Sequence, residues 1–405
     1  MPSIALFCGK FTNEEETLEQ LRSLLAFEVV TDEDIISEAC NRKLAERNKM
    51  EQAVYKKTSV FNQFNFERER NVAHLKSLLA ERLAKKQNVI YAGFISLLIP
   101  HDVTHVLKVL VVDSKESRSR RAVASGLSES EAAKQIRAAD QSAYGWTDFL
   151  FQKEAFEQSL YDIVIPTEEK SVAEIGAIIQ KNCNSTAVLE NEASLQAVND
   201  FAITAQVEHA LAVKGQKVEV KTRNGRVCLK VNKSAFSFSK LAEKISEIAS
   251  SVHGVEGVEV QQGKGYRTSI YRDLQFELPP KVLLVDDEKE FVQTLSERLV
   301  TRNVGSYAVF DGQQALDFID DDAPDVMVLD LKMPGISGIE VLKKTKKTNS
   351  DIEVIILTGH GSDADRKTCI SMGAFAYLQK PIDVETLSAT IREAHKKRIE
   401  AKESG

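Results

Sequence analysis

Cysteine is scarce in this chain of 405 residues. Five cysteines are scattered with no paired spacing, and no histidine cluster accompanies them. An odd, dispersed set excludes a disulfide framework and gives no indication of a zinc site. Reduced thiols of this kind are typical of a cytosolic protein. The five are Cys8, Cys40, Cys183, Cys228 and Cys369.

Long apolar segments are missing as well. The longest, near Val89 to Pro100, is too short and too interrupted to span a bilayer. The first residues carry no basic region followed by an apolar stretch of the signal-peptide type. We therefore expect no membrane span and a cytoplasmic location.

Basic residues are fewer than acidic ones, 53 against 60. The net charge of −7 argues against a nucleic-acid partner. A hydrophobic content of 43% is ordinary for soluble globular modules. A chain of this length predicts roughly two to four domains.

Four short apolar segments in the last third of the chain predict strands, and each is followed by or ends in a polar side chain. The carboxyl ends of parallel strands share one edge of an open sheet, which is where ligands and chemistry lie. We therefore expect the four ends to converge. The segments are Lys281–Val285 before Asp286 and Asp287, Val326–Leu329 before Asp330, Glu353–Leu357 before Thr358, and Ala376–Gln379 before Lys380.

Phosphoryl transfer to a carboxylate requires this combination of side chains. Acidic oxygens from Asp286, Asp287 and Asp330 suit a hard cation such as Mg²⁺. Asp330 would be the nucleophile, Thr358 would hydrogen-bond a phosphoryl oxygen, and Lys380 would neutralise developing charge. Considered singly, the acidic pair is better explained as a helix N-cap and the lysine as a solvated surface charge. Considered together, these residues favour a site for phosphoryl transfer.

Residues 281–398 resemble the receiver domain of two-component response regulators. The family's acidic pair matches Asp286 and Asp287, and its Asp-x-x-Met-Pro-x-x-x-Gly motif matches the segment that begins at Asp330. Its Lys-Pro pair matches Lys380 and the proline that follows, and its switch hydroxyl matches Thr358.

The resemblance implies a flavodoxin-like (βα)5 fold and phosphorylation of Asp330 by a histidine kinase or phosphotransfer protein. It also implies Mg²⁺ held by Asp286, Asp287, Asp330 and the backbone carbonyl of Lys332. Thr358 and the aromatic Tyr377 would act as the switch.

Residues 1–183 alternate apolar segments with helical ones, which predicts a parallel α/β sheet. Arg118, Arg120 and Arg121 follow the fourth predicted strand. This order is similar to the cytidylate-kinase-like branch of nucleoside monophosphate kinases, a P-loop kinase fold in which arginines close over phosphates. An exposed basic helix start explains the arginines equally well. The predicted strands are Ser3–Cys8, Phe27–Val30, Asn88–Gly93, Val106–Val112 and Tyr161–Pro166.

The loop after the first strand departs from that family. A phosphate loop needs Gly-x-x-x-x-Gly-Lys-Ser/Thr, whereas residues 8–16 contain one glycine and three consecutive glutamates. Lys10 comes too early to be the motif lysine. We expect a degenerate domain that has lost phosphoryl transfer, and contact of Lys10 and the three arginines with a nucleotide or phosphate stays open.

Residues 197–262 predict a small α+β module in the order α-β-β-α-β. Asn224-Gly225 between alternating residues is a hairpin signal, and Val252–Val260 predicts the last strand. The pattern resembles the BON domain and implies a docking or dimerising role. Residues 263–280 read as a linker and residues 399–405 as a charged tail.

These patterns predict a response regulator of a two-component phosphorelay. Because no sizeable module follows the receiver-like region, we expect output through altered contacts with the upstream modules, with a partner, or with a second copy through the receiver or the BON-like module. Two alternatives remain: a nucleoside monophosphate kinase gated by the receiver, and a scaffold that docks without phosphate turnover.

Overall fold

The computed structural model describes residues 2–56, 58–85, 88–232, 238–263, 266, 279–300, 302, 304–359 and 361–403. The chain forms two compact units. The first holds Met1–Thr58 and Glu67–Gln275; the second holds Ser59–Phe66, with the short helix α4 (Asn62–Asn65), and Phe276–Gly405. Most of the predicted linker and the last two residues of the predicted tail lie outside the described residues.

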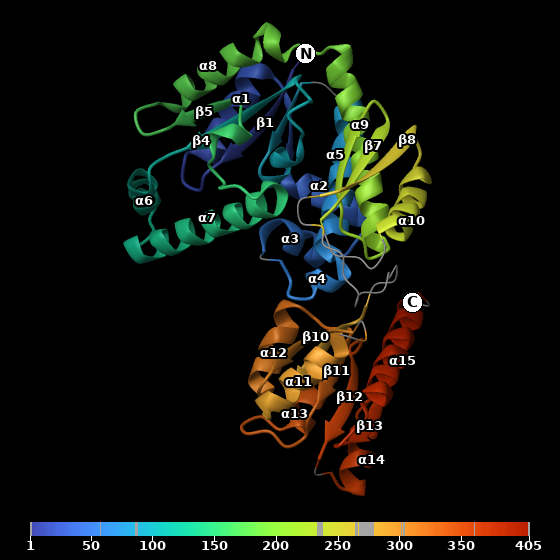
Figure 1. The fold of residues 1–405 in the computed structure, drawn as a ribbon. Coiled ribbons are helices and arrows are strands. Elements are labelled where there is room, and N and C mark those ends of the chain that lie inside the picture. The colour runs from blue at the N-terminus through green and yellow to red at the C-terminus, as the bar shows by residue number, and fades with distance from the viewer. Residues whose placement is uncertain are drawn as a thin grey trace. The chain divides into compact units, whose positions relative to one another are not determined.

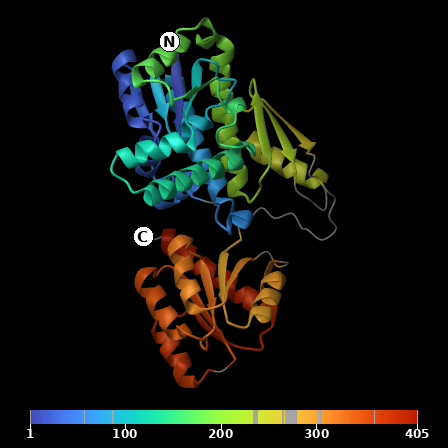
Figure 2. The ribbon, with the colours of Figure 1, turned by 90° about the vertical axis from the view of Figure 1, so that its left-hand side faces the viewer.

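A five-stranded parallel sheet organises the first unit (Figure 1). Its strand order is β2-β3-β1-β4-β5, the crossovers being helical, as predicted for a kinase-like fold. Helices cover the sheet on both faces (Figure 2). The strands are β1 (Ser3–Cys8), β2 (Glu28–Thr31), β3 (Val89–Ala92), β4 (Val106–Val112) and β5 (Ile163–Pro166); the helices are α1 (Glu14–Leu25), α2 (Asp32–Asn41), α3 (Arg47–Tyr55), α5 (Glu67–Lys85), α6 (Lys115–Ala124), α7 (Glu129–Phe151) and α8 (Val172–Cys183), with the 3-10 turns η1 (Phe94–Leu98), η2 (Gln158–Leu160) and η3 (Thr186–Val188).

The middle module has the predicted α-β-β-α-β order: α9 (Glu192–Val213), β6 (Glu219–Arg223), β7 (Arg226–Val231), α10 (Phe238–Ser250) and β8 (Gly257–Gln262). β7 pairs antiparallel with β6 and parallel with β8. The last strand begins later than predicted, because Gly254 has a φ of 87° and turns the chain before Gly257.

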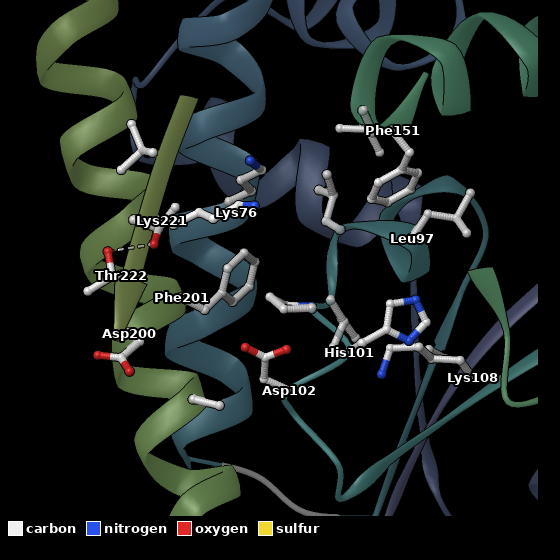
Figure 3. Close-up of a pocket in the computed structure, with 18 of the residues that line it drawn as sticks. Lys76, Leu97, His101, Asp102, Lys108, Phe151, Asp200, Phe201, Lys221 and Thr222 are labelled. Atoms are coloured by element: carbon white, nitrogen blue, oxygen red, sulfur yellow. Dashed lines mark hydrogen bonds between the residues drawn. The ribbon is translucent and has the colours of Figure 1, made fainter. Parts of the chain in front are cut away.

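Helix α9 joins the middle module to the first sheet within one compact unit. It packs lengthwise on α5, where the Lys76 ammonium lies 2.7 Å from a Glu208 carboxylate oxygen (Figure 3). At its other side Asp200 accepts hydrogen bonds from the amides of Asn224 and Gly225, at 2.7 and 2.9 Å. This carboxylate anchors the hairpin turn to the helix.

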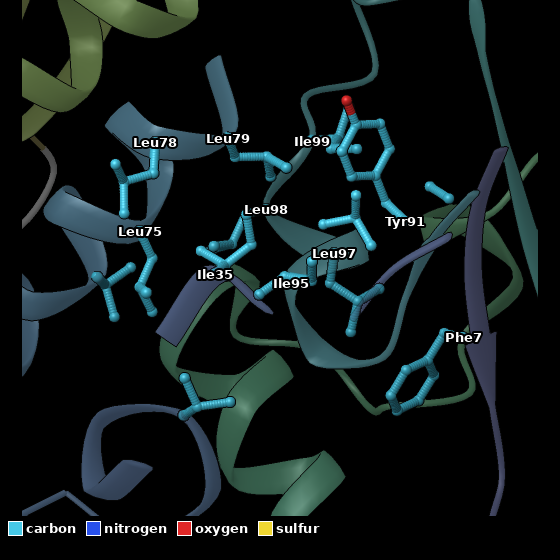
Figure 4. Close-up of a cluster of buried hydrophobic side chains, with 14 of the residues drawn as sticks. Phe7, Ile35, Leu75, Leu78, Leu79, Tyr91, Ile95, Leu97, Leu98 and Ile99 are labelled. Atoms are coloured by element: carbon cyan, nitrogen blue, oxygen red, sulfur yellow. The ribbon is translucent and has the colours of Figure 1, made fainter. Parts of the chain in front are cut away.

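Alternate residues of the central strand enter two separate cores. Ala5 and Phe7 pack against α2, α5 and η1 (Figure 4), whereas Ile4 and Leu6 face α1 and α8. A parallel strand buried on both faces explains the continuous apolar pattern of β1. Each fully buried aliphatic side chain contributes about 1.5–3 kcal/mol.

A second five-stranded parallel sheet, in the order β10-β9-β11-β12-β13, forms the second unit. This is the flavodoxin-like order, as predicted. Two apolar clusters lie on its two faces, one with α12 and α13 and the other with α11 and α15. The elements are β9 (Lys281–Val285), α11 (Lys289–Val300), β10 (Gly305–Val309), α12 (Gly312–Asp321), β11 (Val326–Leu329), α13 (Gly338–Thr348), β12 (Glu353–Thr358), α14 (Asp363–Ser371), β13 (Ala376–Gln379) and α15 (Val384–Glu403).

Across the described parts of both units, every helix is too short or too polar to cross a bilayer.

Candidate functional site at the carboxyl edge of the second sheet

Strand register brings the predicted side chains to one edge. Val285 of β9 pairs with Leu329 of β11, so the residues that follow them, Asp286 and Asp330, leave the sheet at the same level. On β12, Thr358 pairs with Gln379 of β13, directly before Lys380. The convergence expected from four strand ends is therefore present in the geometry.

Lys380 lies at the centre of this edge. Its ammonium is 2.5 Å from Asp286 Oδ2, 3.1 Å from Glu288 Oε1 and 3.9 Å from Asp330 Oδ1. The same nitrogen lies 4.5 Å from the centre of the Phe291 ring, within range for a cation–π contact. One ammonium thus contacts several carboxylates and offsets part of their negative charge in a partly dry site.

Backbone amides orient the two buried carboxylates. The Lys332 amide donates to Asp330 Oδ2 at 2.9 Å, and the Glu288 amide donates to Asp286 Oδ1 at 3.0 Å. The remaining oxygen of Asp330 is the one nearest Lys380. Both carboxylates are buried, so their charges act in a medium of low polarity.

Burial and charge move the pKa values of this cluster. Burial raises the pKa of Asp286, although the hydrogen bond from Lys380 opposes that shift. Burial disfavours the charged form of Lys380, but hydrogen bonds to Asp286 and Glu288 outweigh it and the pKa of Lys380 is raised. Lys380 therefore stays an ammonium near neutral pH.

The predicted switch residues lie close together beside this edge. Thr358 is buried at the end of β12. The Tyr377 hydroxyl lies so close to Gly361 that a Cβ there would fall 1.5 Å from it, and the same Cβ would be 3.1 Å from the Thr358 methyl. Tyr377 Oη has no hydrogen-bond partner among the described residues.

The predicted metal ligands are placed less uniformly. Asp286 and Asp330 flank Lys380, whereas the Asp287 side chain is exposed. Among the described residues, no three acidic, histidine or cysteine side chains are arranged to hold a metal ion. The two buried carboxylates still offer the hard oxygen donors that suit Mg²⁺.

In the first unit, an internal carboxylate occupies the loop after β1. Glu14 accepts hydrogen bonds from the amides of Phe11 and Thr12, at 3.3 and 3.0 Å. The Lys10 ammonium pairs with the same carboxylate at 3.0 Å. Backbone amides and a lysine are the donors that a phosphate loop offers to its ligand, and here Glu14 uses them.

Two of the three predicted arginines reach this loop. Arg121 donates to the Phe11 carbonyl at 2.7 Å and contacts Asp113. Arg118 lies beside Gly9, and its guanidinium is held by both oxygens of Asp140 at 2.8 Å.

Arg120 lies apart from the other two arginines. It pairs with Glu168 at 3.2 Å, and both side chains are exposed. The structure thus gathers Arg118 and Arg121 but gives each a carboxylate partner from the protein itself.

Several residues of these two sites were not predicted from the sequence. Glu288, the third acidic residue of the Asp-Asp-Glu sequence, could have been suspected as a partner of the lysine. Lys10 and Glu14 have the i,i+4 spacing of an ion pair. Asp113 and Asp140 had no local signal, because their arginine partners are set by how α6 and α7 pack.

Comparison with known proteins matches two regions of the chain. The response regulator receiver domain model matches residues 282–392. The cytidylate kinase-like family model matches residues 19–169, a region that begins after the β1 loop.

Among curated proteins, the response regulator MprA of Mycolicibacterium vanbaalenii is 35% identical over 115 residues, 28% of this chain and 50% of that protein. The transcriptional regulatory protein CpxR of Escherichia coli is 41% identical over 112 residues, 28% of this chain and 47% of that protein. This chain therefore spans about half the length of the curated relatives it matches.

Solved structures of receiver domains are similar to part of this chain. The receiver domain of the Francisella response regulator 1452 is 32% identical and aligns over 29% of this chain and 98% of that one, with a TM-score of 0.28. A receiver domain protein from Clostridium thermocellum is 31% identical over 29% of this chain and 96% of that one, with a TM-score of 0.29.

Proposed function

We propose that this chain is a response regulator of a two-component phosphorelay. It contains a response regulator receiver domain at residues 282–392 and a cytidylate kinase-like region at residues 19–169. Asp330 is the phosphoryl acceptor, and a histidine kinase or phosphotransfer protein in the cytoplasm is the donor. The observation that carries the proposal is the convergence of Asp286, Asp330 and Lys380 at one sheet edge.

The transfer follows from the orientation of Asp330. With Oδ2 held by the Lys332 amide, Oδ1 is the nucleophile. It forms a bond to the phosphorus of a phosphohistidine while the P–N bond breaks, and the departing imidazole takes up a proton. Lys380, 3.9 Å from Oδ1, neutralises charge on the phosphoryl oxygens.

Magnesium fits this site chemically. Asp286, Asp287 and Asp330 with the carbonyl of Lys332 would hold it, and when bound it would supply further neutralisation of the phosphoryl group. Its binding would compete with the contact between Lys380 and Asp286.

Thr358 and Tyr377 link the acceptor to the protein surface. The Thr358 hydroxyl hydrogen-bonds a phosphoryl oxygen, and movement of Thr358 changes the space that its methyl shares with Tyr377 and Gly361. The output is then a change in contacts with the rest of the chain, with a partner, or with a second copy. The beryllofluoride complex, a phosphoryl mimic, should alter hydrogen exchange or oligomeric state; if both stay unchanged, the coupling is rejected.

Labelling by acetyl phosphate tests the acceptor. The wild-type chain should gain one phosphoryl group per molecule, and Asp330→Asn should gain none. Asp317→Asn, an exposed carboxylate on α12, is the matched control and should label normally. Labelling that persists in Asp330→Asn would remove the proposal, and absence of any labelling would favour the docking scaffold.

A nucleoside monophosphate kinase is the second candidate, favoured by Arg118 and Arg121 beside the β1 loop. The loop after β1 argues against a kinase activity, because Glu14 already accepts the hydrogen bonds of the backbone amides that a nucleotide phosphate needs. ATP consumption with CMP and other monophosphates tests it. Activity that falls in Arg118, Arg120 or Arg121 variants would establish the kinase.

A further inference from the structure

A pocket of about 950 Å³ lies within the first unit, away from both sites described above. One wall comes from β4 and the segment after η1, and the opposite wall comes from α9 and β6 (Figure 3). Its size falls within the range of small-molecule sites, about 300–1,000 Å³.

Lys108 is the unusual residue of this pocket. It lies in the amino-terminal half of β4, a strand that is otherwise apolar, and it is 5% exposed. Its ammonium makes one long hydrogen bond, 3.4 Å to the Val106 carbonyl. Within the described part of the chain no carboxylate lies within 4 Å of this nitrogen. A buried ammonium without a counter-ion destabilises the fold unless something else pairs with it.

Three other charged groups in the lining, Asp200, Glu208 and Lys221, already have partners, and Asp102 and Arg223 also line the pocket. Asp200 binds the hairpin amides, Glu208 binds Lys76 at 2.7 Å, and Lys221 pairs with Glu219 at 3.0 Å. None of these can neutralise Lys108.

Three titratable groups lie around Lys108. Burial lowers the pKa of Lys108, and the more distant charges of Asp162 and Asp102 only partly oppose this. Burial, reinforced by Lys108, lowers the pKa of His101, so this ring is neutral at pH 7. Among the described residues, neither Asp162 nor Asp102 forms an ion pair within 4 Å of the Lys108 ammonium, so this end of the pocket can still pair with a further negative charge.

The rest of the lining is largely apolar and aromatic. Phe151 and Phe201 stand on opposite sides of the pocket (Figure 3). Thr222 and Thr204 add a pair of hydroxyls 2.8 Å apart. An apolar body could lie between the two rings while one charged group reaches Lys108.

The pocket is distinct from the β1 loop. Its lining includes Ala5 and Lys108, which pair with each other in the amino-terminal halves of β1 and β4. Gly9, Phe11 and Arg118, at the carboxyl edge, are absent from the lining.

We infer that this pocket binds a small organic anion, a carboxylate or a phosphate monoester on an aromatic or apolar body, whose negative group pairs with Lys108. The ligand contacts β4 on one side and α9 with β6 on the other. Its binding therefore stabilises the packing of the middle module against the first sheet.

Three naphthalene probes test the charge requirement on the full-length chain: 1-naphthoate, 1-naphthyl phosphate and the neutral 1-naphthalenemethanol. Calorimetry should show at least one anion binding roughly tenfold or more tighter than the neutral probe, since hydrogen bonds between charged groups contribute about 1.5–3 kcal/mol. The better of the two anions identifies the preferred group.

Lys108→Met removes the charge and keeps the length of the side chain. It should abolish the preference for the anion and leave affinity for the neutral probe unchanged, while Lys134→Met, an exposed lysine on α7, should change neither. Equal affinity of wild type and Lys108→Met for the anions, or no anion binding at millimolar concentration, overturns the inference.

Thermal unfolding separates a binding role from a structural one. Removing an uncompensated buried charge should raise the Tm of the ligand-free chain in Lys108→Met. A lower Tm would mean that Lys108 supports the fold, and would also overturn the inference.

Discussion

Lys380 sets much of the electrostatic state of the proposed phosphoryl-acceptor edge. Its ammonium stands between Asp286 and Asp330 and takes the place that a divalent cation would share with them. Its single positive charge therefore offsets part of the negative charge of the site, and a metal ion would compete with this side chain for the carboxylates.

Lys380→Met should uncouple metal binding from phosphoryl transfer. Without the ammonium, the affinity for Mg²⁺ should rise by roughly tenfold because two buried carboxylates lose their internal cation. Labelling by acetyl phosphate should fall sharply. Titration calorimetry with Mg²⁺ and a labelling time course measure the two effects. Unchanged Mg²⁺ affinity would show that the lysine does not compete.

The carboxylate of Glu14 occupies the donors of the loop after β1. Glu14→Ala should free the Phe11 and Thr12 amides, so that inorganic phosphate or ATP binds where the wild type binds neither. Loss of these hydrogen bonds should cost about 1 kcal/mol of unfolding free energy. Calorimetry and urea unfolding measure the outcomes.

Glu15→Ala is the control for Glu14→Ala, because its side chain is exposed on the same first turn of α1. Wild type that already binds ATP as tightly as Glu14→Ala would contradict the account of a filled loop.

The convergence of Asp286, Asp330 and Lys380 at one sheet edge was predictable from the sequence, whereas the side-chain partners of other residues were not. Asp286 and Asp330 follow apolar segments that form fully buried strands, and Lys380 follows β13, the half-buried strand at the edge of the sheet. The Arg118 ion pair with Asp140 joins two helices whose packing angle no local pattern encodes. The exposure of Asp287 is likewise a consequence of how the loop after β9 turns.

At the scale of elements, the β6–β7 hairpin shows a local signal that specifies structure. Asn224 and Gly225 both have positive φ, 49° and 73°, as the Asn-Gly pair predicts for a tight turn. The anchoring of that turn by Asp200 could not be read from the sequence, because it depends on where α9 lies.

Gly225→Ala should destabilise the first unit by about 1–2 kcal/mol, the cost of a left-handed conformation for a residue with a Cβ. The added Cβ would also lie 2.9 Å from the Glu256 side chain. Gly257→Ala, where no atom lies within 4 Å, should be near neutral. Urea unfolding compares the two, and equal midpoints would contradict the turn argument.

The α5–α9 contact carries a pair of histidines. The rings of His74 and His209 are 4.2 Å apart. Burial, with His209 and Arg70 adding to it, lowers the pKa of His74 to about 4, and burial also lowers the pKa of His209. The unfolded chain takes up these protons first as pH falls, so this contact loses stability between about pH 6.5 and about pH 4.

When the pH is lowered from about 7.5 to about 5, the free energy of unfolding should fall less in His74→Gln than in wild type. The comparison of the two proteins is necessary because Asp32 has the opposite effect on the free energy of unfolding. Burial raises the pKa of Asp32 to about 6, so its protonation stabilises the folded chain over part of the same range as pH falls. Urea midpoints at the two pH values give the answer. Equal losses in both proteins would show that His74 does not titrate as the structure requires.

At the scale of the whole molecule, two parallel sheets with helical crossovers were predictable from the spacing of apolar segments. The compact joining of the middle module to the first was not, since it rests on lengthwise packing of α9 on α5. The resemblance of residues 197–262 to the BON domain stays a prediction; its α-β-β-α-β order is confirmed.

The central claim is that one oxygen of Asp330 receives a phosphoryl group, and borohydride trapping tests it most directly. Reduction of an aspartyl phosphate leaves homoserine, which mass spectrometry locates in a digest. The account predicts homoserine at position 330 after treatment with acetyl phosphate and Mg²⁺, and none after treatment without a phosphodonor. Homoserine at another aspartate, or at none, would contradict it.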